Sequence, residues 1–146
     1  MRAAAVALGL VAILACAAEA PVVITDKPVT VVVSVPAAVR GAHDILLQLQ
    51  QVTVPKNASA TWNMFVEMPS ANAKTSTEAP GFAGYVTTLP NPSAAGNPPK
   101  GMTMQLPDAA AAIVRKLDQV RLTFVPVTTA PGETVKVGSV RLEPAQ

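Results

Sequence analysis

The sequence contains few of the residues that build active sites and metal centres. Its 146 residues include one histidine, His43, and one cysteine, Cys16. A lone histidine excludes, within this chain, the imidazole clusters that hold a zinc ion or a pair of copper ions. His43 stands beside Gly41 and Asp44 at the entrance to an expected strand, and no Gly-x-Ser-x-Gly elbow accompanies it. We therefore interpret His43 as a surface turn residue and predict no catalytic residue and no enzymatic activity.

Aromatic and charged residues are also scarce. Aromatic residues make up 3% of the chain and charged residues 14%, and the net charge of +2 includes no run of lysine or arginine. Nucleic-acid binding requires clustered basic residues, often with aromatic residues for stacking, so we expect no nucleic-acid partner. There is no glycine-rich phosphate loop, and nothing favours a catalytic pair among the scattered carboxylates. Those after residue 20 are Asp26, Asp44, Glu67, Glu78, Asp108, Asp118, Glu133 and Glu143.

Proline and β-branched segments are what the sequence has in quantity. Fourteen prolines and clusters of Ser, Thr and Asn divide the chain into short segments, as in all-β domains. The carboxy-terminal part shows this most clearly, because two alternating segments flank the turn Ala130-Pro131-Gly132. We predict a mainly all-β fold, a two-sheet antiparallel β-sandwich of about seven strands. The expected strands are 29–35, 45–54, 61–68, 81–89, 102–106, 120–126 and 134–143.

One segment changes from the period of a strand to that of a helix. Residues 108–117 combine Asp108, an alanine run, and Ile113 with Leu117 four positions further on. This pattern predicts one short helix that is capped by the Asp108 side chain.

Several positions predict irregular strands. The apolar alternation changes phase at Gly138-Ser139 and again before Val52, which indicates a β-bulge at each place. Gly84 inside an expected strand indicates a close approach of another segment to the backbone. Residues 70–80 and 91–100 are rich in turn formers, and we expect them to be loops.

The first 18 residues have the composition of an export signal. Met1-Arg2 precedes an apolar run that suits a signal peptide and is too short to span a bilayer as a helix. Two endings stay open. Cleavage after Ala18 would release one soluble domain, residues 19–146, whereas the Ile-Leu-Ala-Cys run at 13–16 resembles a lipobox in which Cys16 carries a lipid. Either ending predicts an exported protein, periplasmic or secreted, and only the lipobox ending holds it to a membrane, through Cys16.

Methionines form the sharpest local feature. Met102 and Met104 occupy alternate positions of one expected strand, on the same face, and Met64 and Met68 lie in another. Thioether sulfur is a soft ligand that selects Cu(I), so copper is the one cofactor that these residues suggest. Methionine is also an ordinary filler of irregular cores, and the two interpretations both stay open.

Four strand motifs follow one another along the chain. They are Met64-Phe-Val-Glu67, Gly81-Phe-Ala-Gly-Tyr-Val86, Thr123-Phe-Val-Pro126 and Val135-Lys-Val-Gly-Ser-Val-Arg-Leu-Glu143. Their order resembles the carboxy-terminal domain of tyrosinase-type polyphenol oxidases, which is named for a Lys-Phe-Asp-Val motif. The first segment here is a degraded form of that motif that keeps Phe65. The similarity extends over residues 26–143.

The resemblance implies a β-sandwich that shields the dicopper site of a catalytic domain. Because the catalytic domain is not found in these 146 residues, we expect a non-catalytic binding module that acts on a separate tyrosinase-like copper oxidase. Phe65, Phe82 and Tyr85 are the candidates to face that partner, although a sandwich with few aromatic residues also needs Phe65 and Phe82 in its core. Two alternatives stay open: an envelope protein that handles copper through thioethers, and a structural or adhesive envelope domain.

Overall fold

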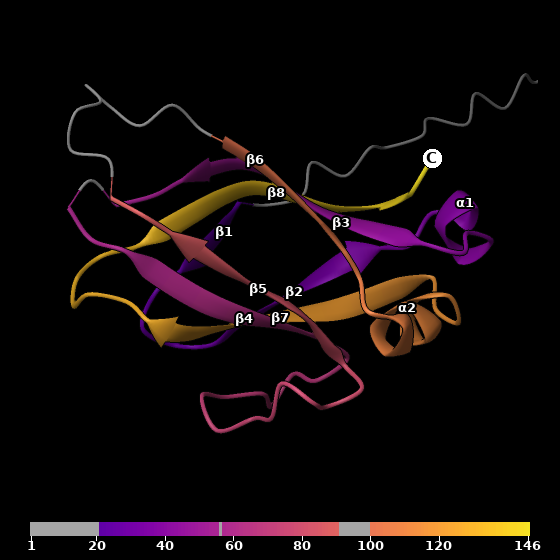
Figure 1. Ribbon diagram of the computed structural model, residues 1–146, viewed down its shortest axis with the longest axis horizontal. Coiled ribbons are helices and arrows are strands. Elements are labelled where there is room, and N and C mark those ends of the chain that lie inside the picture. Colours follow the sequence, from indigo (N-terminus) through magenta and orange to yellow (C-terminus); the bar gives the residue numbers. More distant parts are fainter. Residues whose placement is uncertain (1–20, 56, 91–99) are drawn as a thin grey trace, which may run out of the picture.

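The computed structural model, which describes residues 21–55, 57–90 and 100–146, consists of two antiparallel sheets that face each other (Figure 1). The predicted β-sandwich is therefore confirmed. Sheet A contains, in spatial order, β1 (Val22–Ile24), β8 (Val135–Pro144), β3 (Ile45–Thr53) and β6 (Lys100–Gln105). Sheet B contains β2 (Val29–Ser34), β7 (Gln119–Thr128), β4 (Ala60–Val66) and β5 (Phe82–Thr88).

The structure contains two short elements that the sequence pattern did not predict. β1 is an additional strand that pairs with β8, with Val22 opposite Val137. A one-turn helix, α1 (Ala37–Arg40), follows Pro36. Both elements are too short for a repeating apolar pattern to develop, so only their neighbours in the fold reveal them.

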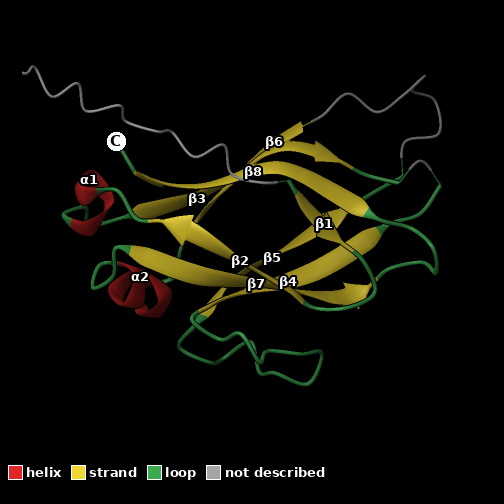
Figure 2. Cartoon of the chain, turned by 180° about the vertical axis from the view of Figure 1, so that it is seen from behind, coloured by secondary structure: helices red, strands yellow, loops and turns green. Residues whose placement is uncertain are grey.

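The predicted helix is present as α2 (Asp108–Val114), but both of its ends differ from the prediction. A capping residue precedes the helix with an extended backbone, and Pro107 holds that position with φ −58° and ψ 151°. Asp108 is already helical and makes no capping hydrogen bond, so its predicted capping role is wrong. The helix stops early because the chain tightens after Val114, where the Leu117 N–H donates to the Val114 oxygen at 3.1 Å. α1 and α2 lie together at one end of the sandwich (Figure 2).

The phase change at residues 138–139 is present, but it is not a bulge of β8 against β3. Leu49 pairs with Val140 and Val52 pairs with Val137, so two residues separate these pairs on both strands and the register is unbroken. The alternation of buried and exposed side chains changes phase in β3 at the residues that face the same change in β8. β3 does have an extra residue relative to its other neighbour, β6, because that register shifts between Leu49 and Val52. The bulge predicted in β3 is confirmed, and the bulge predicted in β8 is wrong.

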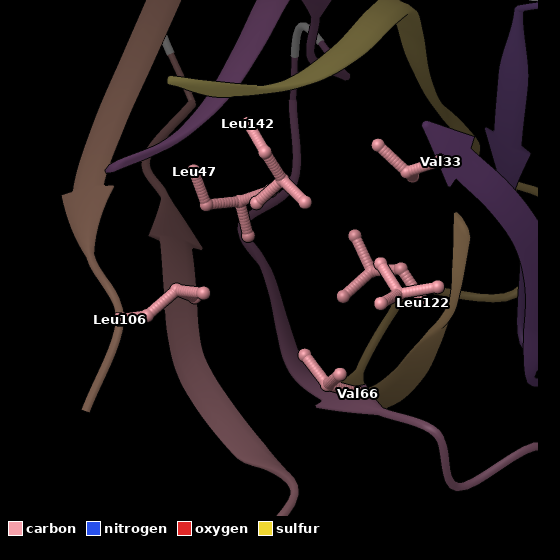
Figure 3. A pocket seen from close by; sticks show the side chains of 7 residues that line it. Val33, Leu47, Val66, Leu106, Leu122 and Leu142 are labelled. Carbon is pink, nitrogen blue, oxygen red and sulfur yellow. The ribbon is translucent and has the colours of Figure 1, made fainter. Parts of the chain in front are cut away.

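The main core fills the space between the sheets. Its largest fully buried side chains include Trp62, Phe124 and Ile45. A cavity of about 10 Å³ remains near the helical end (Figure 3), and the side chains around it are all apolar and point toward one another. It leaves room for about one water molecule, so we attribute it to imperfect packing. The lining residues are Val33, Leu47, Val66, Leu106, Val120, Leu122 and Leu142.

The predicted export signal and Cys16 lie outside the described residues, as does most of the loop expected at 91–100. Within the part of the chain that the structure describes, no helix is long and apolar enough to cross a membrane.

Candidate functional site

The two outer faces of the sandwich differ in chemistry. On sheet A, Gln48 Nε2 donates to Glu143 Oε2 at 2.8 Å, and Gln50 Nε2 donates to Gln48 Oε1 at 3.3 Å. The Ser139 hydroxyl extends this chain of hydrogen bonds by donating to Gln50 Oε1 at 3.3 Å. These polar groups satisfy one another, so sheet A presents a polar surface whose hydrogen bonds are largely internal.

Sheet B instead exposes large apolar side chains. Val32 and Tyr85 point away from the core, because their neighbours Val33 and Val86 are buried in it. Only one large hydrophobic residue of the described ranges is exposed on sheet A, and it is Val23 of β1. We call the corresponding set on sheet B the outer apolar face. It consists of Val32, Tyr85, Leu89 and Val127, which are 59%, 67%, 74% and 53% exposed.

A second apolar cluster lies on the outside of sheet B. Phe65 alternates along β4 with Met64 and Val66, which fill the main core, so Phe65 points to the opposite side of the sheet. Its ring meets that of Phe82 edge to face, with centroids 5.6 Å apart and an interplanar angle of 61°. The cluster contains Phe65, Ala71 and Val125, with Met68 and Phe82 packed against them.

The β4–β5 loop, residues 67–81, carries part of this cluster and lies below sheet B in the view of Figure 1. Its conformation is fixed by local hydrogen bonds. The Asn72 N–H donates to Thr75 Oγ1 and the Lys74 N–H donates to Asn72 Oδ1, both at 2.9 Å. This stretch, predicted as a polar loop, therefore has a defined path.

An ion pair anchors the loop at its first residue. The Arg121 backbone N–H donates to Glu67 Oε1 at 2.6 Å, and Arg121 Nη2 donates to Glu67 Oε2 at 2.8 Å. The side-chain hydrogen bond from Arg121 lowers the pKa of Glu67, aided by the backbone bond and the guanidinium charge and opposed by partial burial. Glu67 has φ 54°, which is uncommon for a residue with a side chain. The ion pair therefore helps to hold an unfavourable backbone conformation.

The three aromatic candidates differ in accessibility. Phe65 is completely buried, Phe82 is half-buried and Tyr85 is exposed, so Tyr85 is the most accessible of the three to a partner. Sequence reasoning missed Leu89 as a surface residue, because an apolar side chain in a strand-like segment resembles a core residue. The strand period carried the signal, because Leu89 lies on the same face as the polar Thr87 and Tyr85, and that face is exposed.

The structure divides the four methionines into two groups. Met64, Met102 and Met104 belong to the main core or pack against it, whereas Met68 packs in the second cluster outside sheet B. Met104 also reaches from β6 to β5, because a Cβ placed on Gly84 would lie 2.9 Å from its sulfur. The close approach predicted at Gly84 is confirmed.

His43 lies on the surface, as its sequence context indicates. Its side chain is 93% exposed, and Nδ1 lies 2.9 Å from Asp44 Oδ1. Across residues 21–55, 57–90 and 100–146, no group of three or more His, Cys, Asp and Glu side chains is placed to hold a metal ion.

Comparison with known proteins relates this architecture to polyphenol oxidases. Neither the protein-family models nor the curated proteins include a match. Among solved structures, recombinant latent aurone synthase, a polyphenol oxidase, matches with a TM-score of 0.63 and 18% identity, over 84% of this chain and 25% of that chain. Latent apple tyrosinase matches with a TM-score of 0.62 and 17% identity, over 84% of this chain and 27% of that chain. The chain thus spans about a quarter of the length of these enzymes and shares the fold of one part of them.

Proposed function

We propose that residues 19–146 act as an exported, non-catalytic module that binds a separate tyrosinase-like copper oxidase and covers its active site. The observation that supports this proposal most is the fold, which matches part of enzymes described as latent. A dicopper site needs several histidine ligands, and this chain contains one histidine. The oxidase would therefore come from outside these 146 residues.

The outer apolar face of sheet B is the surface that we assign to this partner. An exposed tyrosine offers a large apolar contact together with a hydroxyl that remains able to form hydrogen bonds, and tyrosine is enriched in interfaces for this reason. Complete burial of Leu89, which is 74% exposed, would contribute at most about 1.5–3 kcal/mol. The polar groups of sheet A already bond to one another, so that surface has less to gain from a partner.

Co-purification from a native extract tests the proposal. We expect the tagged, exported protein to co-elute with a copper oxidase, and the double variant Tyr85→Ser/Leu89→Ser to lose it. Val23→Ser is the matched control, because Val23 is an exposed apolar residue on sheet A. Elution of the wild-type protein without an oxidase would contradict the proposed function. Loss of the oxidase in Val23→Ser but not in the double variant would contradict the assigned surface.

A further inference from the structure

We propose that Met64, Met102 and Met104 form a binding site for one Cu(I) ion between the edge strands β5 and β6. This inference concerns the chain alone and goes beyond the proposed function, because thioether binding of Cu(I) requires no partner oxidase.

The site is located where the two sheets meet at one edge. β6 is the last strand in the order of sheet A, and β5 is the last strand in the order of sheet B. The Met104 sulfur lies 2.9 Å from the place that a Cβ on Gly84 would occupy, so this side chain of β6 extends to β5. Gly84 has φ 142° and no Cβ, so the sulfur occupies space that a larger residue would fill.

The strand register brings the other two thioethers toward this point. Met64 is paired with Gly84, and the Cα atoms of paired residues are about 4.5–5.5 Å apart. Met102 lies two residues before Met104, on the same face of β6 and about 7 Å away along the strand. All three side chains pack against the main core, and each has three rotatable bonds that let its sulfur adjust.

The chemistry of the set favours a soft monovalent ion. Three neutral thioethers suit Cu(I) better than a hard divalent cation, which prefers oxygen ligands. Met64 is completely buried, whereas Met102 and Met104 are half-buried on the edge strand. An ion could therefore enter from the edge and lie against the apolar core, where water is excluded.

Titration with Cu(I) under reducing conditions tests the site directly. The full chain would carry Cys16→Ser, because a free thiol binds Cu(I) strongly by itself. With carbon-13 in the methionine methyl groups, we expect the signals of Met64, Met102 and Met104 to shift together and saturate at a single equivalent. The Met68 signal should not shift, since Met68 belongs to the other cluster. Unchanged signals for the three methionines at excess Cu(I), or an equal shift of Met68, would overturn the inference.

Substitution by leucine gives a second, independent readout. Leucine and methionine have similar volumes, so each variant should remain folded, which circular dichroism would verify. In competition with a Cu(I) chelator, we expect Met104→Leu to weaken binding by about tenfold or more, because loss of a ligand should cost at least as much as loss of an outer-shell partner. Met68→Leu is the matched control and should leave the affinity unchanged. Unchanged affinity in Met104→Leu, or equal weakening in Met68→Leu, would show that these thioethers do not form the site.

Discussion

Gly84 illustrates how one residue determines the shape of an edge of the sandwich. Its φ of 142° disfavours any residue with a Cβ, and that Cβ would lie 2.9 Å from the Met104 sulfur. We expect Gly84→Ala to lower the free energy of unfolding by about 1–3 kcal/mol, measured in urea. Gly101→Ala on the neighbouring β6 is the control, because a Cβ there meets nothing within 4 Å. Equal destabilisation by the two substitutions would contradict this explanation.

Glu67 is a second single residue that affects the stability of the fold, in this case through its charge. Because Arg121 lowers the pKa of Glu67 in the folded state, the carboxylate stabilises the fold above its unfolded pKa, near 4.5. This contribution is lost as the pH falls through the lower folded value. We expect Glu67→Gln to reduce the free energy of unfolding by about 1 kcal/mol at neutral pH, with allowance for solvent screening. The difference from the wild type should shrink in acid.

Asp118→Asn is the control for this measurement. Asp118 also forms an ion pair, with Arg40, but its side chain is 89% exposed. Exposed ion pairs contribute little, so we expect no measurable change at any pH. If the difference in free energy of unfolding between the wild type and Glu67→Gln persists in strong acid, the charge of Glu67 is not the cause of that difference.

The contact between β3 and β8 at Gln51 and Gly138 is a property of the strand pair and not of either residue alone. Gln51 in β3 has φ 53°, and a Cβ on Gly138 in the facing strand would lie 2.4 Å from Gln51 Oε1. The three nearest atoms all belong to the Gln51 side chain, and its Cβ, at 2.8 Å, cannot swing away as the amide can. We therefore expect Gly138→Ala to destabilise the fold by about 1–3 kcal/mol, and Gln51→Gly to restore much of the loss. The coupling energy from a double-mutant cycle in urea measures this, and additive effects would contradict it.

At the level of elements, the sequence predicts strands better than their pairing. β2 and β8 are rich in β-branched residues, and β3 begins with an alternation of Leu and Gln, so their patterns sufficed. The bulge at residues 138–139 was predicted wrongly because one strand cannot show that its partner changes phase at the same place. The Asp108 cap failed because Pro107 already provides the extended residue before the helix. Burial of Phe65 outside the main core depends on the loop that covers it, and alternation alone does not reveal this.

For the whole molecule, the difference between the two outer faces is the property most relevant to function. Alternation along β5 and the residue after it places Tyr85 and Leu89 on one face within a short segment, whereas Val32 and Val127 come from other strands. In the function proposed above, this surface would contact the copper oxidase, and the module would act by binding rather than by catalysis.

The decisive measurement is the rate of phenol oxidation by the co-purified copper oxidase as a function of the concentration of added protein. We predict that the rate falls to a plateau as the wild-type protein saturates the enzyme. The Tyr85→Ser/Leu89→Ser variant should require a higher concentration for the same effect. A rate that does not depend on the amount of wild-type protein would contradict the proposed function.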